Sequence, residues 1–454
     1  MSYDLLIRNG TLVLPAGPVA ADLAIEDGRI AAIGPELAGG AAAELDASGL
    51  HVLPGLIDAH VHFNEPGRAE WEGFATGTRA LAAGGATCFF DMPLNAHPPT
   101  VDRASFELKA AAASQSALVD WALWGGLVPG NVERLPELAE CGVIGFKAFM
   151  SNSGIDDFAS VDDGTLFAGM EQAAKLGLPV AVHAENDQLT GALAARARRE
   201  GRAGVRDYLA SRPAVAELEA ISRAILFAEA TGCPLHIVHV STGRGVALVA
   251  EAAARGVDVS CETCPHYLVL TEDDVERIGA LAKCAPPLRP QAEQDALWAH
   301  IAAGTLPMVA SDHSPAPADM KTGDDFFAIW GGISGCQSTL PLLLDAGAHQ
   351  RGLPLATIAR ISAGFVAERF GLERKGRLEV GCDADLALVN LGASAALEAD
   401  ALHYRHRHSP YAGMTARGQV AATFLRGRAV FRDGQPVGTG GGRLVRPQPR
   451  LERH

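Results

Sequence analysis

The middle of the chain alternates short apolar runs with Ala-rich helical stretches, and no other feature restricts the fold as strongly. Eight apolar runs, each typical of a buried strand, end near His60, Asp91, Leu127, Phe149, His183, His239, Glu262 and Asp312. Stretches with helical spacing lie between them, at 71–83, 104–114, 166–175, 214–229 and 245–254. Strands that alternate with helices are typical of parallel βα units. Eight such units predict an α/β protein with a closed (β/α)8 TIM-type barrel rather than an open sheet.

The two ends of the chain have a different pattern. Residues 1–51 and 376–454 show strand-like alternation with Asn-Gly and Asp-Gly turn pairs, which are typical of β-hairpins. Neither end alone offers enough strands for a core of its own. We therefore predict one small β-sandwich built from both chain ends. The expected division is 1–51 for its first part, 52–375 for the barrel, and 376–454 for its second part with a C-terminal tail.

Six polar residues are found where the predicted barrel strands end. They are His60, His62, Lys147, His183, His239 and Asp312. The carboxyl ends of parallel barrel strands meet at one mouth, and two histidines spaced two apart on a strand face the same side. Four imidazoles and one carboxylate supply nitrogen and oxygen donors suited to zinc or a similar cation. This set predicts two divalent metal ions, most simply zinc, at the barrel mouth.

Lys147 is the unusual member of the set, because two cations would repel an ammonium group. Addition of CO2 would turn the amine into a carbamate (N6-carboxylysine), an anion whose two oxygens can bridge two metals. A Schiff base with a carbonyl substrate is the alternative role for a buried lysine on a barrel strand. That alternative leaves the four histidines without a role. We therefore predict that carboxylated Lys147 bridges the metals.

Composition argues against several classes of partner. The formal net charge of -15 disfavours nucleic acid and an anionic membrane surface. The chain has no basic and apolar leader, and no apolar run approaches the roughly 18 residues of a membrane span. We therefore expect a soluble, cytoplasmic protein. The Cys261-x-x-Cys264 pair lacks the second pair of a structural zinc site, so we expect buried free thiols.

Seven motifs along the chain carry a family resemblance. They lie at 54–67, 146–154, 264–268, 281–289, 311–315, 330–333 and 383–386. Together they resemble the allantoinases, in the cyclic-amidase branch of the amidohydrolase superfamily. The resemblance implies hydrolytic opening of the hydantoin ring of allantoin, a small cyclic ureide, to allantoate in purine breakdown. It also implies a homo-oligomer, with a tetramer favoured.

The resemblance assigns a role to each predicted ligand. The more buried metal of the family has ligands that correspond to His60, His62 and Asp312. The more exposed metal has ligands that correspond to His183 and His239. Carboxylated Lys147 and a hydroxide would bridge the two metals. Asp312 would act as the general base that accepts the proton of the nucleophile and then as the acid that protonates the leaving nitrogen.

The resemblance also suggests which residues contact the substrate. The suggested contacts are Asn64, Asn95, Asn152, Cys284 and Gly332. Asn64 stands where dihydroorotases carry an arginine for the substrate carboxylate, and an amide suits a neutral ring. The alternative is that Asn64 only shapes its loop.

Other functions compete with the allantoinase interpretation. Hydantoinases and dihydropyrimidinases commonly have a tyrosine a few residues after the bridging lysine, and residues 150–157 contain none. They form the main alternative, and a dihydroorotase is a less favoured one, since Arg68 could supply a charge. A metal-free structural relative is the alternative from another class. All six ligands are present, and burying so many polar groups without a metal would be costly, which argues against a scaffold.

Overall fold

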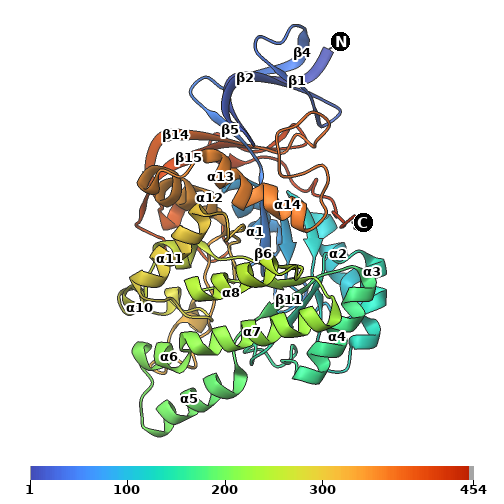
Figure 1. Ribbon diagram of the computed structural model, residues 1–454. Helices are drawn as coiled ribbons and strands as arrows, with labels where there is room; N and C mark the ends of the chain where they lie inside the picture. Colours follow the sequence, from blue (N-terminus) through green and yellow to red (C-terminus); the bar gives the residue numbers. More distant parts are fainter. Residues whose placement is uncertain (1, 449–454) are drawn as a thin grey trace.

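The computed structural model describes residues 2–448 and places a βα barrel beneath a smaller β module (Figure 1). The barrel strands are β6 (Leu56–Val61), β7 (Ala86–Asp91), β8 (Asp120–Leu123), β9 (Gly125–Gly126), β10 (Phe146–Phe149), β11 (Val180–His183), β12 (Leu235–Ile237) and β13 (Val259–Cys261). They form two parallel sheets, β6-β7-β8 and β9-β10-β11-β12-β13. The parallel order agrees with the predicted TIM-type barrel.

The strands β8 and β9 are two halves of the one strand that the sequence predicts to end near Leu127. They are interrupted at Trp124, whose backbone N–H donates to the carbonyl of Asp91 at 3.0 Å. The N–H of Gly125 donates instead to the carbonyl of Gly145, at 2.9 Å. The chain therefore passes from one parallel sheet to the other at this point.

The eighth predicted strand, which ends near Asp312, consists of isolated bridges rather than a regular strand. Val309 pairs in parallel with Thr263, and His313 pairs in parallel with Val61. The segment thus lies between β13 and β6. The carboxylate of Asp58, on β6, also accepts a hydrogen bond from the backbone N–H of Ser311 at 2.9 Å. These contacts join the two sheets at their second junction, as a barrel requires.

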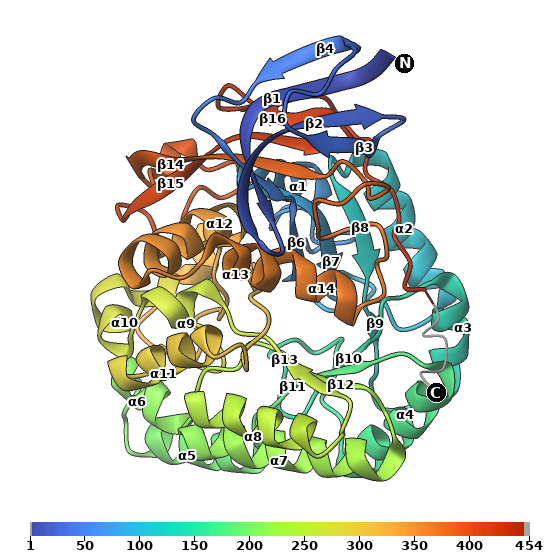
Figure 2. The same cartoon turned by 45° about the horizontal axis from the view of Figure 1, so that its top comes forward.

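Helices cover the outside of the barrel (Figure 2). The five predicted ones are α1 (Phe74–Ala83), α2 (Arg103–Ser116), α4 (Asp163–Leu176), α7 (Ala214–Thr231) and α8 (Gly243–Ala254). Further helices are α3 (Leu135–Cys141), α5 (Asp187–Arg199), α6 (Val205–Ser211), α9 (Pro265–Val269), α10 (Glu272–Ile278), α11 (Gln291–Ala302), α12 (Thr339–Leu342), α13 (Leu355–Ala359) and α14 (Phe365–Arg369). Helix α1 begins later than predicted, because Gly73 before it has a φ of 85°, outside the helical region.

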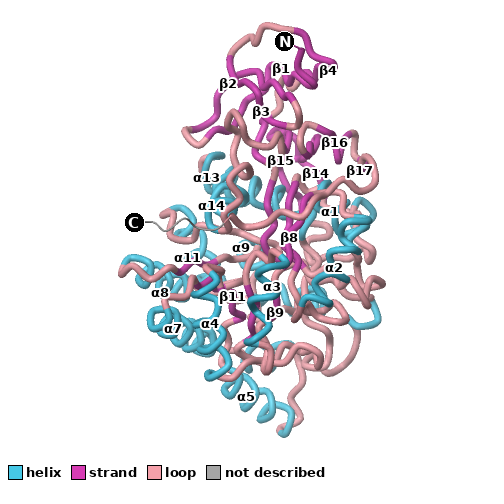
Figure 3. The backbone as a smooth tube through the Cα atoms, turned by 90° about the vertical axis from the view of Figure 1, so that its right-hand side faces the viewer, coloured by secondary structure: helices cyan, strands magenta, loops and turns pink. Residues whose placement is uncertain are grey.

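Both chain ends build the β module, as predicted. Its strands are β1 (Ser2–Leu14), β2 (Gly17–Glu26), β3 (Arg29–Gly34), β4 (Gly40–Asp46), β5 (His51–Pro54), β14 (Leu386–Ala396), β15 (Thr415–Leu425), β16 (Arg428–Arg432) and β17 (Gln435–Pro436). They form one mostly antiparallel sheet, joined where β5 pairs with β14. Ile7 and Leu23 share one apolar cluster with Leu388 and Phe424, so strands from both ends enclose a single core. Figure 3 shows this module beyond one end of the barrel.

A buried ionic cluster joins the module to the barrel. The ammonium group of Lys375 lies 2.8 Å from Asp120 on β8 and 2.6 Å from Asp385, which precedes β14. Asp120, Asp383 and Asp385 also lie close enough together to suggest a cation site, but the ammonium of Lys375 already contacts all three. The cluster is therefore structural. The predicted boundaries of the three segments stay predictions.

Two features bear on the predictions from composition. All eight cysteines are buried and free, as expected for Cys261 and Cys264. Within residues 2–448, no helix has the length and apolar character needed to cross a membrane.

Candidate metal centre

The predicted ligands converge on one cavity of about 250 Å³ at the carboxyl ends of the barrel strands. Those that line it are His60, His62, His183, His239 and Asp312. Lys147 is fully buried on β10, and its amine lies 4.8 Å from the ring centre of Phe149, which also lines the cavity. Residues far apart in the sequence thus meet where the strand pattern places them.

His60, His62 and Asp312 form the first group of donors. One carboxylate oxygen of Asp312 lies 3.2 Å from Nε2 of His60 and 3.4 Å from Nε2 of His62. Burial lowers the pKa of His62, so its ring is neutral and offers a lone pair. Burial alone would raise the pKa of Asp312, but the neighbouring histidines hold it well below its usual range. The group therefore combines neutral imidazole with a carboxylate, as a divalent cation requires.

His183 and His239 form the second group. Nδ1 of His183 lies 3.1 Å from Nε2 of His239, and burial lowers the pKa of both rings. The ring of His239 also lies 5.5 Å from that of His60, between centres, so the two groups adjoin. Two adjacent sets of histidine donors in this cavity could therefore hold metal.

Two buried glutamates orient these rings. Glu262 accepts from Nδ1 of His60 at 2.6 Å, and Glu185 accepts from Nε2 of His183 at 2.8 Å. Each contact fixes the ring proton on one nitrogen and leaves the lone pair of the other toward the metal site. Burial would raise the pKa of both carboxyls. The histidines beside Glu262, and Arg212 with His183 beside Glu185, lower them to about 2.

Neither glutamate is among the site residues predicted from the sequence. Glu262 ends a predicted strand, and Glu185 follows His183 by two residues. The signal in the sequence is a carboxylate residue near the end of a predicted strand. It identifies a partner only when the barrel brings the two strands together.

We expect Glu262→Gln to weaken metal binding by about 10- to 100-fold, as loss of an outer partner of a metal-bound histidine does. The amide carries no charge and can present an N–H to Nδ1 of His60, so the favoured tautomer is lost. Titration of the metal-free protein with zinc would measure this. Glu251→Gln, at an exposed site on α8, is the matched control. Equal affinities in the two variants would contradict the orienting role.

The backbone at the site is strained. His239 and Asp312 have φ values of 40° and 46°, and Asn64 and Asn95 have values of 64° and 68°. Residues other than glycine rarely adopt this left-handed backbone conformation, which costs about 1–2 kcal/mol for each residue. Such strain gathers where a fixed geometry serves function. Asparagine adopts this conformation more readily than most other residues. The backbone conformation alone can therefore explain why residue 64 is an asparagine.

A second possible donor group shares Asp312. Cys264 and His266 place their donor atoms within 4.8 Å of each other and of this carboxylate. Burial raises the pKa of the Cys264 thiol well above its usual value, so the sulfur stays protonated and is a poor ligand. The histidine group around His60 therefore fits a metal better.

The predicted substrate contacts divide into two sets. Asn95, Asn152, Cys284 and Gly332 line the cavity. Asn64 is buried outside the lining, with its amide nitrogen 3.5 Å from the carbonyl of Pro315. The N–H of Gly332 donates to the carbonyl of Lys283 at 2.8 Å, and its own carbonyl accepts from Lys321. Contacts of these residues with substrate stay predictions.

Several lining residues were not predicted. They are Tyr208, Arg212, Lys283, Ser314, Phe327 and Trp330, among others. Tyr208 lies on α6 and Arg212 directly follows it, at least 25 positions from any predicted ligand. No periodicity or spacing in the sequence links them to the barrel mouth.

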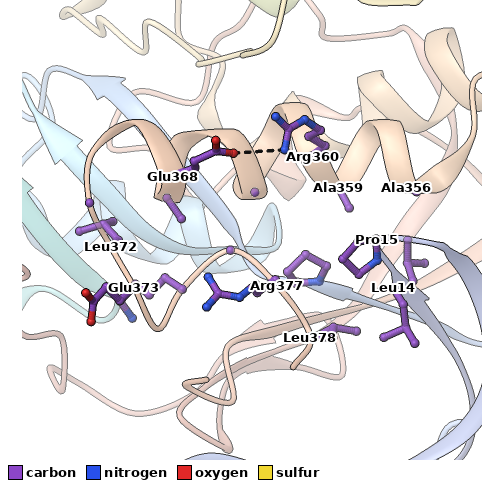
Figure 4. Close-up of a pocket in the computed structure, with 17 residues that line it drawn as sticks. Leu14, Pro15, Ala356, Ala359, Arg360, Glu368, Leu372, Glu373, Arg377 and Leu378 are labelled. Carbon is purple, nitrogen blue, oxygen red and sulfur yellow. Dashed lines mark hydrogen bonds and ion pairs between the residues drawn. The ribbon is translucent and has the colours of Figure 1, made fainter. Parts of the chain in front are cut away.

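A second cavity, of about 360 Å³, lies at the other end of the barrel, beside α13, α14 and the β module (Figure 4). Pro54, just before β6, lines it, whereas His60 lies at the far end of that strand. The described lining includes no histidine, aspartate or cysteine, and Arg360 is paired with Glu368 at 3.4 Å. It therefore offers no donor set comparable to that of the first cavity.

Known proteins resemble the chain over nearly its full length. Residues 51–430 match the amidohydrolase family. The chain is 62% identical over 447 residues to a Rubrobacter xylanophilus protein named allantoinase, covering 98% of each. It is 56% identical over 448 residues to a Deinococcus radiodurans protein of the same name, covering 99% of this chain and all of the relative. The solved L-hydantoinase (dihydropyrimidinase) from Arthrobacter aurescens has a TM-score of 0.95 at 34% identity, covering 97% of this chain and 99% of that one.

Proposed function

The chain belongs to the amidohydrolase family, and we propose that it opens the hydantoin ring of allantoin by hydrolysis to give allantoate. The observation that carries this proposal is the near full-length similarity to relatives named allantoinase, which exceeds the similarity to the solved hydantoinase. The reaction is hydrolysis of a C–N bond in a cyclic amide. It belongs to purine breakdown.

We propose that the six ligands hold two divalent metal ions, most simply zinc, with Lys147 carboxylated between them. Burial lowers the pKa of Lys147 to about 7, so a large share of the amine is neutral near neutral pH. Only the neutral amine has a lone pair to form the N–C bond with CO2, and the proton on nitrogen then passes to solvent. The buried amine has no hydrogen-bond partner among the described residues, which leaves it free to react.

Asp312 carries the proton transfers in the proposed mechanism. When bound, the two cations supply a water of low pKa and polarise the ring carbonyl. The carboxylate of Asp312 accepts the proton released as the attacking oxygen bonds to the carbonyl carbon. It then gives this proton to the ring nitrogen, which would otherwise leave as a poor amide anion. Glu185 and Glu262 keep the imidazoles in the tautomers that bind metal.

The proposed substrate pocket is the cavity beside these ligands. Asn95 and Asn152 line it and could bond the polar groups of the ring and its ureido arm, together with Cys284 and Gly332. Arg212 and Lys283 add positive charge to the lining. Asn64 acts through its loop in this proposal, because it lies outside the lining. We also propose that zinc is the native metal, that the protein assembles as a tetramer and that it is located in the cytoplasm.

A hydantoinase or dihydropyrimidinase activity is the second candidate, favoured by the structural similarity to the Arthrobacter aurescens enzyme. A substrate panel separates the two. It contains both enantiomers of allantoin, hydantoin, dihydrouracil and dihydroorotate, at neutral pH with bicarbonate and zinc, and each ring-opened product is quantified. We expect dominant turnover of allantoin. Preference for hydantoin or dihydrouracil would assign the chain to the sister group, and preference for dihydroorotate would contradict both.

A further inference from the structure

One wall of the substrate cavity is an irregular segment, residues 326–332. Six consecutive residues of it, from Phe327 to Gly332, line the cavity, and it contains turns and bends but no helix or strand. Its carbonyls therefore lack the regular partners that secondary structure provides. Two lysines, Lys283 and Lys321, donate hydrogen bonds to several of these carbonyls.

Lys283 binds the first half of this wall. Its ammonium group donates to the carbonyl of Phe327 at 3.2 Å and to the carbonyl of Ile329. It also lies 4.7 Å from the ring centre of Tyr208. Lys283 is only 4% exposed, so these contacts replace nearly all of its hydration.

Lys321 binds the second half. Its ammonium group donates to the carbonyl of Trp330 at 3.1 Å and to the carbonyl of Gly332. A longer contact of 3.5 Å reaches the carbonyl of Ala280, outside the wall. Lys321 is 8% exposed. Together the two lysines bond four of the carbonyls between 327 and 332.

Within residues 2–448, the hydrogen bonds of both ammonium groups go to backbone carbonyls alone. Burial lowers the pKa of both amines to about 7, because a charged group is costly to bury. An apolar side chain would fill the same space without that penalty. What lysine adds is donation to several carbonyls at once.

The far end of the wall packs directly against the ligand segment. A side chain in place of the hydrogen of Gly332 would lie 2.4 Å from the carbonyl oxygen of Ser314, two residues after Asp312. The backbone N–H of Ser314 in turn donates to the carbonyl of Ile333 at 2.9 Å. A displacement of the wall would therefore change the space beside the metal ligands.

We infer that Lys283 and Lys321 are positioning residues that hold the 326–332 wall in the shape that binds the ring substrate. Neither residue takes part in the bond-breaking step. The inference rests on the proposed function, because it assumes that the cavity beside the metal ligands binds the substrate. It predicts an effect on substrate binding that is separate from metal binding and from global stability.

The test replaces each lysine by methionine, with Lys175→Met at an exposed site on α4 as control. For Lys283→Met and Lys321→Met we expect KM for the best substrate of the panel to rise about tenfold, with kcat changed less than about threefold. Amide hydrogen exchange in peptides covering 322–333 should become faster. Metal content should stay close to that of the parent protein. Tm should fall by no more than a few degrees, because removal of a buried charge partly offsets the cost of leaving two carbonyls without a donor.

Lys283→Gln and Lys321→Gln retain two N–H donors without the charge, and we expect intermediate values of KM. They also serve where a methionine variant fails to fold. Unchanged exchange in 322–333, or a fall in kcat and metal content with KM unaltered, would overturn the inference. Hydrogen exchange does not depend on which ring is hydrolysed. If the substrate panel contradicted the allantoin assignment, the hydrogen-exchange result could therefore still be interpreted.

Discussion

Lys147→Ala is expected to reduce hydrolysis to near background and to lower metal content below two ions per chain. The substitution removes the only side chain proposed to bridge the metals, from a site that is fully buried. Its effect on metal affinity should exceed the roughly 100-fold upper range for loss of an outer-shell partner. Elemental analysis after gel filtration and the rate of ring opening would measure both changes.

Adding short carboxylic acids to Lys147→Ala tests specifically whether the missing group is a carboxylate. Acetate or propionate could enter the space left by the side chain and supply a carboxylate in place of the carbamate, so we expect partial recovery of activity. Lys175→Ala, at an exposed site on α4, should show neither the loss nor the recovery. Full activity of Lys147→Ala without added acid would contradict the carbamate bridge. Loss of activity with two metals retained would restrict Lys147 to a role other than holding them.

Asp312→Asn is expected to lower kcat by about 10²- to 10⁴-fold at saturating metal, the range for loss of a general acid–base group. The amide keeps an oxygen near Nε2 of His60 and His62, but it cannot accept and return a proton at the reacting atoms. KM should change little in comparison. Steady-state kinetics over a range of zinc concentrations would separate the loss of proton transfer from weaker metal binding.

Asp433→Asn is the control for this substitution. Asp433 lies in a turn with φ of 54°, its side chain is 91% exposed, and asparagine tolerates that backbone. We expect it to keep the parental kcat. If excess zinc restored full activity to Asp312→Asn, the carboxylate would serve only as a ligand, and another group would have to move the proton.

The sequence alone determined the barrel and the residues that meet at its mouth. In a parallel barrel the carboxyl ends of all strands point the same way, so residues at strand ends converge whatever the loops do. That rule placed His60, His183 and His239 together without any knowledge of distances. The turn pairs and alternation at the two chain ends likewise indicated the shared β module, because neither half could enclose a core alone.

Only the tertiary structure decided which groups orient the ligands and shape the cavity. The contact of Glu262 with His60 spans 202 positions, and that of Lys283 with Ile329 involves loops without periodicity. Asn64 and Asn95 both have left-handed backbones and suitable side chains, yet only Asn95 of the two lines the cavity. Strand periodicity fixes the side on which a residue lies. The direction of a loop side chain depends on contacts made across the whole fold, which no local pattern records.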